Sequence, residues 1–354
     1  MLVFDNWLYV EVAAGLTSCK NSRIVRLRAK SLLPLLILAA IPLRADDGAA
    51  SVAAGGVVVM NREPRVTMAK EVLQISASKV IADYDFRNDS NEDIRTEVAF
   101  PIPDYDHDLA RERVEPSQLG FDDFQLWINA TPTRYLVEAR AFLKDIEYTK
   151  LLHSMHIDIP TFGHATLDGN SLDIQTLAPA QRKQLEAAGL VNQDGGEPLW
   201  QVRKKYYWQQ TFPKHKTVHI RHEYSPILGG SNSIAYGMRA SPDPESAEEL
   251  KSFCIEGQLH SILQSVLESE DKNASYSYVD FILTTANTWK TPIEDFTLIV
   301  KRTHRKDSLG DYVSFCWDGP VTRIDTDHFS AHATNLVPAK ELRVGFFSVE
   351  HSRF

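Results

Sequence analysis

The sequence predicts a mainly β fold with α+β elements. Two observations carry the β prediction: side chains alternate between apolar and polar with a period of two at 79–88 and 94–100, and a turn cluster of Asn, Asp, Ser and Glu separates these runs. A third observation predicts a helix: the stretch at 245–270 has apolar residues at i, i+3 and i+4, which is typical of an amphipathic helix. We expect an antiparallel β-sandwich-like N-terminal domain with a helical insertion, and a C-terminal helix packed on an antiparallel sheet.

In the first half, short β-rich runs precede a long strand that ends at the turn cluster. The next strand presents Ile94, Thr96, Val98 and Phe100 on one face, and Pro101 and Pro103 end it. The strands expected here are 66–69, 72–75, 79–88, 94–100, 124–128, 135–142, 200–212 and 217–224.

At about 145–198 the sequence pattern changes from strand-like to helical, and we interpret this segment as a helical insertion in the β domain. Asp145–His153 suits a short helix. Leu177–Leu190 has Pro179 early, strong helix formers inside and Gly189 as a C-terminal stop.

The C-terminal part consists of the helix at 245–270 followed by strands. They are expected at 276–284, 296–301, 313–317, 322–324, 328–333 and 342–349. The flexible stretch Gly229–Ser233 is the candidate boundary, so the predicted parts are 1–45, a β-rich domain at 46–228 and an α+β domain at 229–354.

Residues 1–45 contain a secretory signal peptide at about 23–45. Basic residues at 23–30 precede a 13-residue apolar run, 31–43, which is too short to span a bilayer of about 30 Å. The 20-odd residues before it fit no part of a signal peptide and indicate a start site placed too far upstream. We therefore expect a periplasmic or secreted protein without a membrane span.

The net charge of the chain argues against two classes of binding partner. The chain has 38 basic and 47 acidic residues, of which the first 45 positions hold six and two, so the remainder carries a net charge of −13. An acidic surface repels phosphate backbones, which argues against nucleic-acid binding, and it lacks the basic patch that attracts anionic membranes.

Removal of residues 1–45 also removes Cys19 and leaves Cys254 and Cys316. An even pair in an oxidising compartment is usually a disulfide. The alternative is two separate buried thiols.

Two groups of residues invite a metal interpretation. Asp104, Asp106, Asp108 and Glu115 have the carboxylate spacing of a calcium loop, but Leu109 stands where the sharp turn needs Gly. The alternative is a solvated acidic loop.

The histidines are weaker candidates for a zinc site. On a strand, His215 and His219 face one way and His222 the other, so the three cannot meet one metal without a bend. His153 and His156 have no evident third ligand, and structural or surface histidines are the simpler interpretation.

The aromatic run from Trp200 to Phe212 is the remaining candidate. Exposed, Trp200, Tyr207 and Trp208 could stack on sugars or aromatic ligands, whereas the simpler alternative places one side of this strand in the core. The sequence has no Gly-x-Ser-x-Gly elbow, no dinucleotide-binding glycine motif and no phosphate loop, so no cofactor is expected.

Several segments, taken in order, resemble the bacterial family of domain of unknown function 4424. They are Asp47–Ala50, Val98–Pro103 after Asn88, Tyr206–Pro213, His222–Pro226 with Gly229–Ser231, and Trp289–Phe296 with Ser314–Cys316. The resemblance covers nearly the whole chain after residue 45. It implies export, a β-rich fold and the cysteine pair, and it assigns no catalytic residue.

These observations favour a non-catalytic binding or structural module of the cell envelope, whose partner is another envelope protein or a cell-wall component. The alternative is a periplasmic hydrolase that acts on glycan or peptide through carboxylates brought together by folding.

Overall fold

Alternating side chains produce strands that are buried on one face. In the computed structural model, β4 (Val80–Asn88), β10 (Gln201–Phe212) and β11 (Lys216–Tyr224) each alternate buried with more exposed residues. The structure describes residues 48–53, 57–106, 123–160, 162, 177–192 and 198–352. Strands in several antiparallel sheets dominate these residues, so the predicted mainly β class is confirmed.

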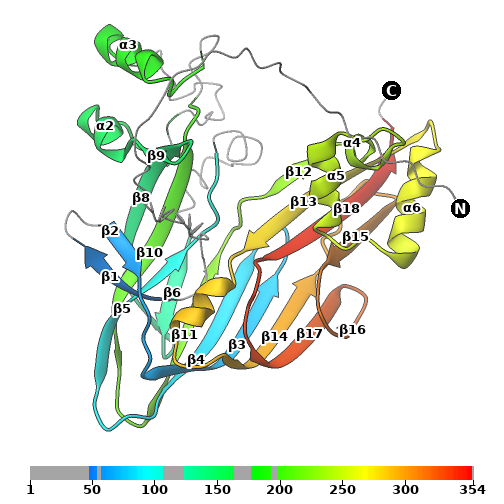
Figure 1. Cartoon of the computed structure of the whole chain (residues 1–354). Coiled ribbons are helices and arrows are strands. Elements are labelled where there is room, and N and C mark those ends of the chain that lie inside the picture. The colour runs from blue at the N-terminus through cyan, green and yellow to red at the C-terminus, as the bar shows by residue number, and fades with distance from the viewer. Residues whose placement is uncertain are drawn as a thin grey trace, which may run out of the picture. The chain divides into compact units, whose positions relative to one another are not determined.

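The described strands form three sheets (Figure 1). The first has the order β2-β1-β5-β10-β8-β9, with bounds Val57–Met60, Gly48–Ala53, Ile94–Pro101, Gln201–Phe212, Leu136–Leu143 and Ile146–Glu147. The second has the order β16-β17-β14-β3-β4-β11-β6-β7, with bounds Val321–Arg323, His328–Leu336, Ile293–Lys301, Val66–Ile75, Val80–Asn88, Lys216–Tyr224, Gln125–Ile128 and Thr131–Pro132. The third has the order β12-β13-β18-β15, with bounds Gly229–Ser231, Lys272–Phe281, Leu342–His351 and Gly310–Phe315.

The first two sheets pack face to face through aromatic rings. Phe86 of β4 lies 5.7 Å from Phe212 of β10, and Phe124, which precedes β6, stacks on Tyr206 at 4.0 Å between ring centroids. These side chains belong to one buried cluster that spans both inner faces. Each such ring contributes about 1.5–3 kcal/mol when it is removed from water, so this layer is a major source of stability.

The second sheet joins distant parts of the chain. β3 pairs with β14 in parallel, in register from Glu71↔Phe296 to Ile75↔Val300, and Figure 1 shows β3 and β4 beside β14 and β17. The sheet therefore contains strands from both sides of the boundary predicted at residues 228–229. The two short runs predicted at 66–69 and 72–75 are one strand, because the register shifts between Met68 and Lys70 without ending the pairing.

The third sheet has helices on one face and the main core on the other. The helices are α5 (Pro244–Lys251) and α6 (Gly257–Leu267). Phe253, which lies between them, and Leu263 of α6 are buried in a cluster with Tyr276 of β13 and Phe347 of β18. Other β13 and β18 side chains, such as Phe281 and Val344, belong to the cluster between the first two sheets. The predicted packing of a C-terminal helix on an antiparallel sheet is confirmed.

The helix predicted at 245–270 is two helices. Asp243 caps α5 by accepting a hydrogen bond from the Ser246 N–H at 2.8 Å, and the chain breaks before α6, where Cys254 has a φ of 49° and Gly257 a φ of 55°. The structure contains the Cys254–Cys316 disulfide, with Cα atoms 5.1 Å apart. This bridge ties the break between the helices to the residue after β15.

The remaining helices are short. α2 (Thr149–Ser154) and α3 (Pro179–Ala187) lie within the predicted insertion, α4 (Ala235–Met238) follows β12, and the 3₁₀ helix η3 (Thr284–Thr288) follows β13. Within the described ranges, no helix has the length and apolarity that crossing a bilayer requires. The predicted signal peptide lies outside the described residues.

Candidate functional site

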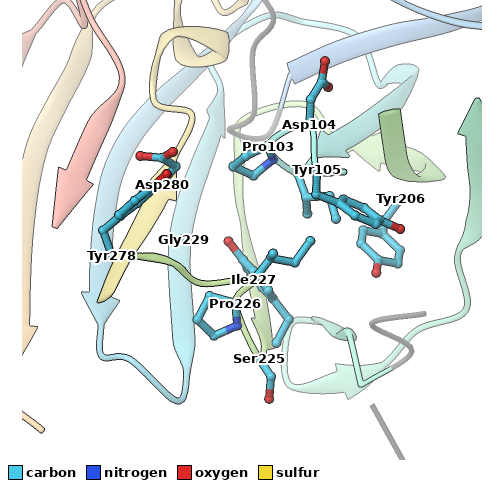
Figure 2. A pocket seen from close by; sticks show the side chains of 12 residues that line it. Pro103, Asp104, Tyr105, Tyr206, Ser225, Pro226, Ile227, Gly229, Tyr278 and Asp280 are labelled. Carbon is cyan, nitrogen blue, oxygen red and sulfur yellow. The ribbon is translucent and has the colours of Figure 1, made fainter. Parts of the chain in front are cut away.

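A small pocket lies where strands of all three sheets meet; we call it the seam pocket. Its volume is about 40 Å³, and its lining comes from the chain after β5, from β10, from the end of β11 and the chain after it, and from β12 and β13. Figure 2 shows Pro103, Tyr105 and Tyr206 on one side, Tyr278 and Asp280 on the other, and residues 225–227 between them.

The first wall is the extension of β5 along β10. Ile102 N–H donates to the Lys204 carbonyl at 3.1 Å, and Tyr105 and Val202 exchange hydrogen bonds of 3.2 and 2.7 Å. Pro103 stands between these two bonds and has no N–H to offer, so the ladder is interrupted at this point. The interruption leaves Pro103 and Tyr105 lining the pocket.

The second wall is the chain that leaves β11. Ser225 donates from its N–H and its hydroxyl to Oδ2 of Asp123, at 2.9 and 2.6 Å, which fixes the exit of the strand. Pro226 and Ile227 follow and contribute apolar surface to the pocket. Gly229 then pairs with Tyr278 of β13.

Both carboxylates of the lining are held by arginines. Asp280 binds Arg343 through two hydrogen bonds, Nε–Oδ1 at 2.6 Å and Nη2–Oδ2 at 2.7 Å, and the Arg343 guanidinium lies 4.4 Å from the Tyr278 ring centroid. Asp104 accepts from Arg203 Nε at 2.9 Å, and its carboxylate points away from the other lining side chains in Figure 2. The bidentate pair engages both oxygens of Asp280, whereas Asp104 is held through Oδ2 alone.

Burial raises the pKa of three groups that line the pocket. It raises the pKa of the Asp104 carboxyl, and the attraction of Arg203 offsets only part of that effect. Burial also raises the pKa of the Tyr224 and Tyr278 phenols, so both stay protonated at neutral pH. The phenols therefore act as hydrogen-bonding and packing groups rather than as nucleophiles.

The aromatic run is split between two faces of β10. Trp200 and Trp208 are buried, and Trp200 packs against Phe162 at 5.7 Å. Tyr207 faces the other way and packs against Ala50 and Ala99. Neither tryptophan presents its ring to solvent. Tyr206, which the sequence did not single out as a site residue, lines the seam pocket instead.

The histidines on β11 have separate surroundings. His222 is fully buried, with its ring 4.6 Å from Phe100 and 5.3 Å from Phe124. His219 lies on the opposite face, where Nδ1 is 2.9 Å from Asp85 Oδ1. His215 is in the turn before, 2.9 Å from Asn91 Oδ1. The structure does not bring the three together, and His153 and His156 lie at the end of α2, far along the chain.

The calcium candidates fall partly outside the described residues. Asp104 pairs with Arg203, Asp106 follows the bridge residue Tyr105, and Asp108 and Glu115 are not described. In the part of the chain that the structure covers, no group of three His, Cys, Asp or Glu side chains is arranged to hold a metal ion.

Sequence reasoning did not find the seam pocket, although its signal was available. Three of the segments that carry the family resemblance, Val98–Pro103, Tyr206–Pro213 and His222–Pro226, all contribute lining residues.

Taken together, these features define a mainly β protein in which a small pocket, lined mostly by tyrosines, prolines and isoleucines, lies at the junction of three sheets. The chain belongs to the family of domain of unknown function DUF4424, whose model matches residues 45–344, which confirms the family prediction. A search of curated proteins finds no significant match.

Two solved structures are similar to the chain at a low level. One is described as a "putative nutrient binding protein" from Legionella pneumophila; it is 14% identical, with a TM-score of 0.38, and the alignment covers 85% of this chain and 72% of that one. The other is the M1 zinc metallopeptidase from Deinococcus radiodurans, 10% identical, with a TM-score of 0.25 and coverage of 81% and 43%. Both TM-scores are below 0.5, so neither likeness carries an argument about function.

Proposed function

We propose that this protein is a non-catalytic binding module of the cell envelope, and that the seam pocket receives one side chain of a partner protein. The observation that carries the proposal is the pocket's size and lining. At about 40 Å³ it is far smaller than the roughly 300–1,000 Å³ of small-molecule sites, and prolines, tyrosines and isoleucines line most of it. A single apolar side chain suits such a site, as anchor residues do at protein interfaces.

The chemistry of the lining supports binding over catalysis. General acid–base catalysis needs carboxylates that are free to exchange protons with a substrate. Here Asp280 is held in a bidentate pair and Asp104 is bonded to Arg203. Because burial raises the pKa of Tyr224 and Tyr278, both phenols stay protonated, so they offer the pocket shape and hydrogen bonds.

The proposed compartment is the periplasm. A disulfide between Cys254 and Cys316 is stable in an oxidising compartment and is rarely kept in the cytosol. The basic and apolar pattern at about 23–45 is the expected export signal.

Site-specific photo-crosslinking tests the proposal in living cells. A photoreactive amino acid at Ile227, which lines the pocket, is expected to yield one discrete adduct with an envelope protein. The same amino acid at Val337, which is 60% exposed and outside the pocket, is the matched control and is expected to yield none. Equal adducts from both positions, or none from Ile227, would contradict the proposal.

A hydrolase of glycan or peptide is the second candidate, and one observation favours it. Asp104 and Asp280 line the same pocket, and burial raises the pKa of Asp104, as a general acid requires. Purified protein incubated with peptidoglycan fragments tests it. Cleavage that is lost in both Asp104→Asn and Asp280→Asn would favour the hydrolase, and cleavage that neither substitution affects would exclude this pocket as its active site.

A further inference from the structure

A second and larger cleft lies at one end of the third sheet, away from the seam pocket. Its volume is about 860 Å³, within the range of ligand-binding sites. The lining comes from the chain between β12 and α4, the start of β13, the chain before β15 and the end of β18. Figure 1 shows α4 beside the end of β18 at this place. We call it the end cleft.

The lining of the end cleft contains three lysine and arginine side chains and two carboxylates. Lys272 and Lys306 both line it and form no salt bridge among the described residues, although the charge of Lys272 helps to lower the pKa of neighbouring Asp271. Of the two acidic lining residues, Glu350 is engaged by Arg305 Nη1 at 3.3 Å and Asp307 is exposed. In a chain with a formal net charge of −9, a local excess of cations attracts an anionic ligand.

A buried carboxylate holds one wall of the cleft in place. Asp311 on β15 is 6% exposed, and its Oδ2 accepts from the Arg305 N–H at 3.1 Å and from the Ser308 hydroxyl at 2.5 Å. Its Oδ1 accepts from the Ser348 hydroxyl on β18 at 2.7 Å. A carboxylate is costly to bury unless hydrogen-bond donors surround it. Here the donors come from the loop at 305–308 and from β18, so Asp311 fixes this loop to the sheet.

A buried hydroxyl orients the guanidinium inside the cleft. Ser275 is 5% exposed, and its oxygen lies 3.0 Å from Arg305 Nη1 and 3.2 Å from Glu350 Oε1. Arg305 is therefore held by its backbone and by its side chain. A guanidinium positioned in this way keeps further N–H donors for a planar anion such as a carboxylate.

The remaining lining suits a polyhydroxylated ligand. It contains serine hydroxyls, the amides of Asn232 and Asn273, and the ring of Tyr236, which is 54% exposed. Asn273 donates its Nδ2–H to the Asn232 carbonyl at 2.7 Å, which leaves its Oδ1 as an acceptor. Amides and hydroxyls bind sugar hydroxyls, and an exposed aromatic ring packs on the apolar face of a sugar.

We infer that the end cleft binds an acidic saccharide, with Lys272, Arg305 and Lys306 contacting its carboxylates and Tyr236 packing on a sugar ring. This inference uses other residues than the proposed function does, so either can fail without the other.

Isothermal titration calorimetry of the purified protein tests the inference with three probes. The first is a trisaccharide of α-1,4-linked galacturonate, the second is maltotriose, a neutral trisaccharide with the same linkage, and the third is inorganic phosphate. The galacturonate trisaccharide is expected to bind, and both other probes are expected to bind at least tenfold more weakly. Lys306→Glu is expected to weaken binding roughly tenfold or more, because it replaces attraction by repulsion.

Matched controls separate the site from net charge. Lys340→Glu makes the same charge change at an exposed lysine that does not line the cleft, and it is expected to leave affinity unchanged. Tyr236→Ala, also at an exposed position, is expected to weaken binding of the galacturonate trisaccharide. The inference is overturned if the galacturonate trisaccharide does not bind, if maltotriose or phosphate binds equally well, or if the two lysine variants behave alike.

Discussion

The ring of Tyr278 lies so close to the backbone of Gly229 that a Cβ atom at Gly229 would be 2.1 Å from its Cζ. The two residues are paired across β12 and β13, and both line the seam pocket. Absence of a side chain at position 229 is therefore what allows the phenol to reach the pocket.

Gly229→Ala is expected to destabilise the protein by about 1–3 kcal/mol, because the added methyl group overpacks the pair. Urea unfolding measures the free energy of unfolding. In a Tyr278→Ala background the same substitution meets no ring, so its cost is expected to fall substantially in a double-mutant cycle. An equal cost in both backgrounds would mean that the ring is not the cause.

Arg343→Met is expected to lower the free energy of unfolding by about 1–3 kcal/mol. It leaves Asp280, whose side chain is 29% exposed, without its bidentate partner, and it removes the cation from the Tyr278 ring. Arg343→Lys should recover only part of this loss, since an ammonium cannot form both bonds in the same geometry.

The control for this pair is Arg62→Met, at an exposed arginine with no carboxylate partner within the described ranges, which should change stability by less than about 0.5 kcal/mol. Equal effects of the substitutions at Arg343 and Arg62 would show that the Asp280 pair contributes nothing specific.

Replacing Cys254 and Cys316 together by Ser is expected to cost about 4 kcal/mol, because the bridge closes a long loop in the unfolded chain. Guanidinium unfolding of the double variant measures this loss, and reduction of the native protein with dithiothreitol should reproduce it. Full stability in the reduced protein would show that packing around Phe253 alone holds the helices.

The stability of the turn before β17 is expected to fall in strong acid. Asp325 accepts hydrogen bonds from the N–H groups of Asp327 and His328, at 2.8 and 2.9 Å, and from His328 Nδ1. These bonds lower the pKa of Asp325 from 3.8 to about 2. Because the folded-state pKa is depressed, the stabilisation is complete above about pH 4 and is lost as the pH falls through 2.

Carboxyl chemical shifts followed by NMR give the Asp325 pKa directly. Asp325→Asn should reduce the pH dependence of the neighbouring amide signals between pH 4 and 2 and leave the part due to Asp327, whose pKa is also lowered. A measured pKa near 3.8 would mean that the turn does not hold the carboxylate as described.

The strands with clear alternation could be predicted from sequence because their period reflects burial of one face, which each residue records locally. β4, β5, β10 and β11 are found where their patterns indicate. The turn before β5 is equally local: buried Asn88 accepts from the N–H and the hydroxyl of Ser90 and donates to the Glu92 carbonyl at 2.9 Å.

The predictions from the sequence differ from the structure where long-range contacts override the local pattern. The helix pattern at 245–270 continues through Ser252–Glu256, but α5 ends at Lys251, and Cys254, which is bonded to Cys316, has a left-handed conformation that an α-helix does not contain. The parallel pairing of β3 with β14 joins segments more than 200 residues apart, and no periodicity reports a partner at that distance.

By itself, the sequence determined the mainly β class, the strand faces and the family, because each depends on local pattern or on residues in order, and it indicated the cysteine pair that the structure contains. Only the tertiary structure decided which sheet each strand joins and that Pro103, Tyr206, Pro226 and Tyr278 surround one pocket. It also placed the lysines of the end cleft together, because both sites are built from segments whose distances are set by packing rather than by chain spacing.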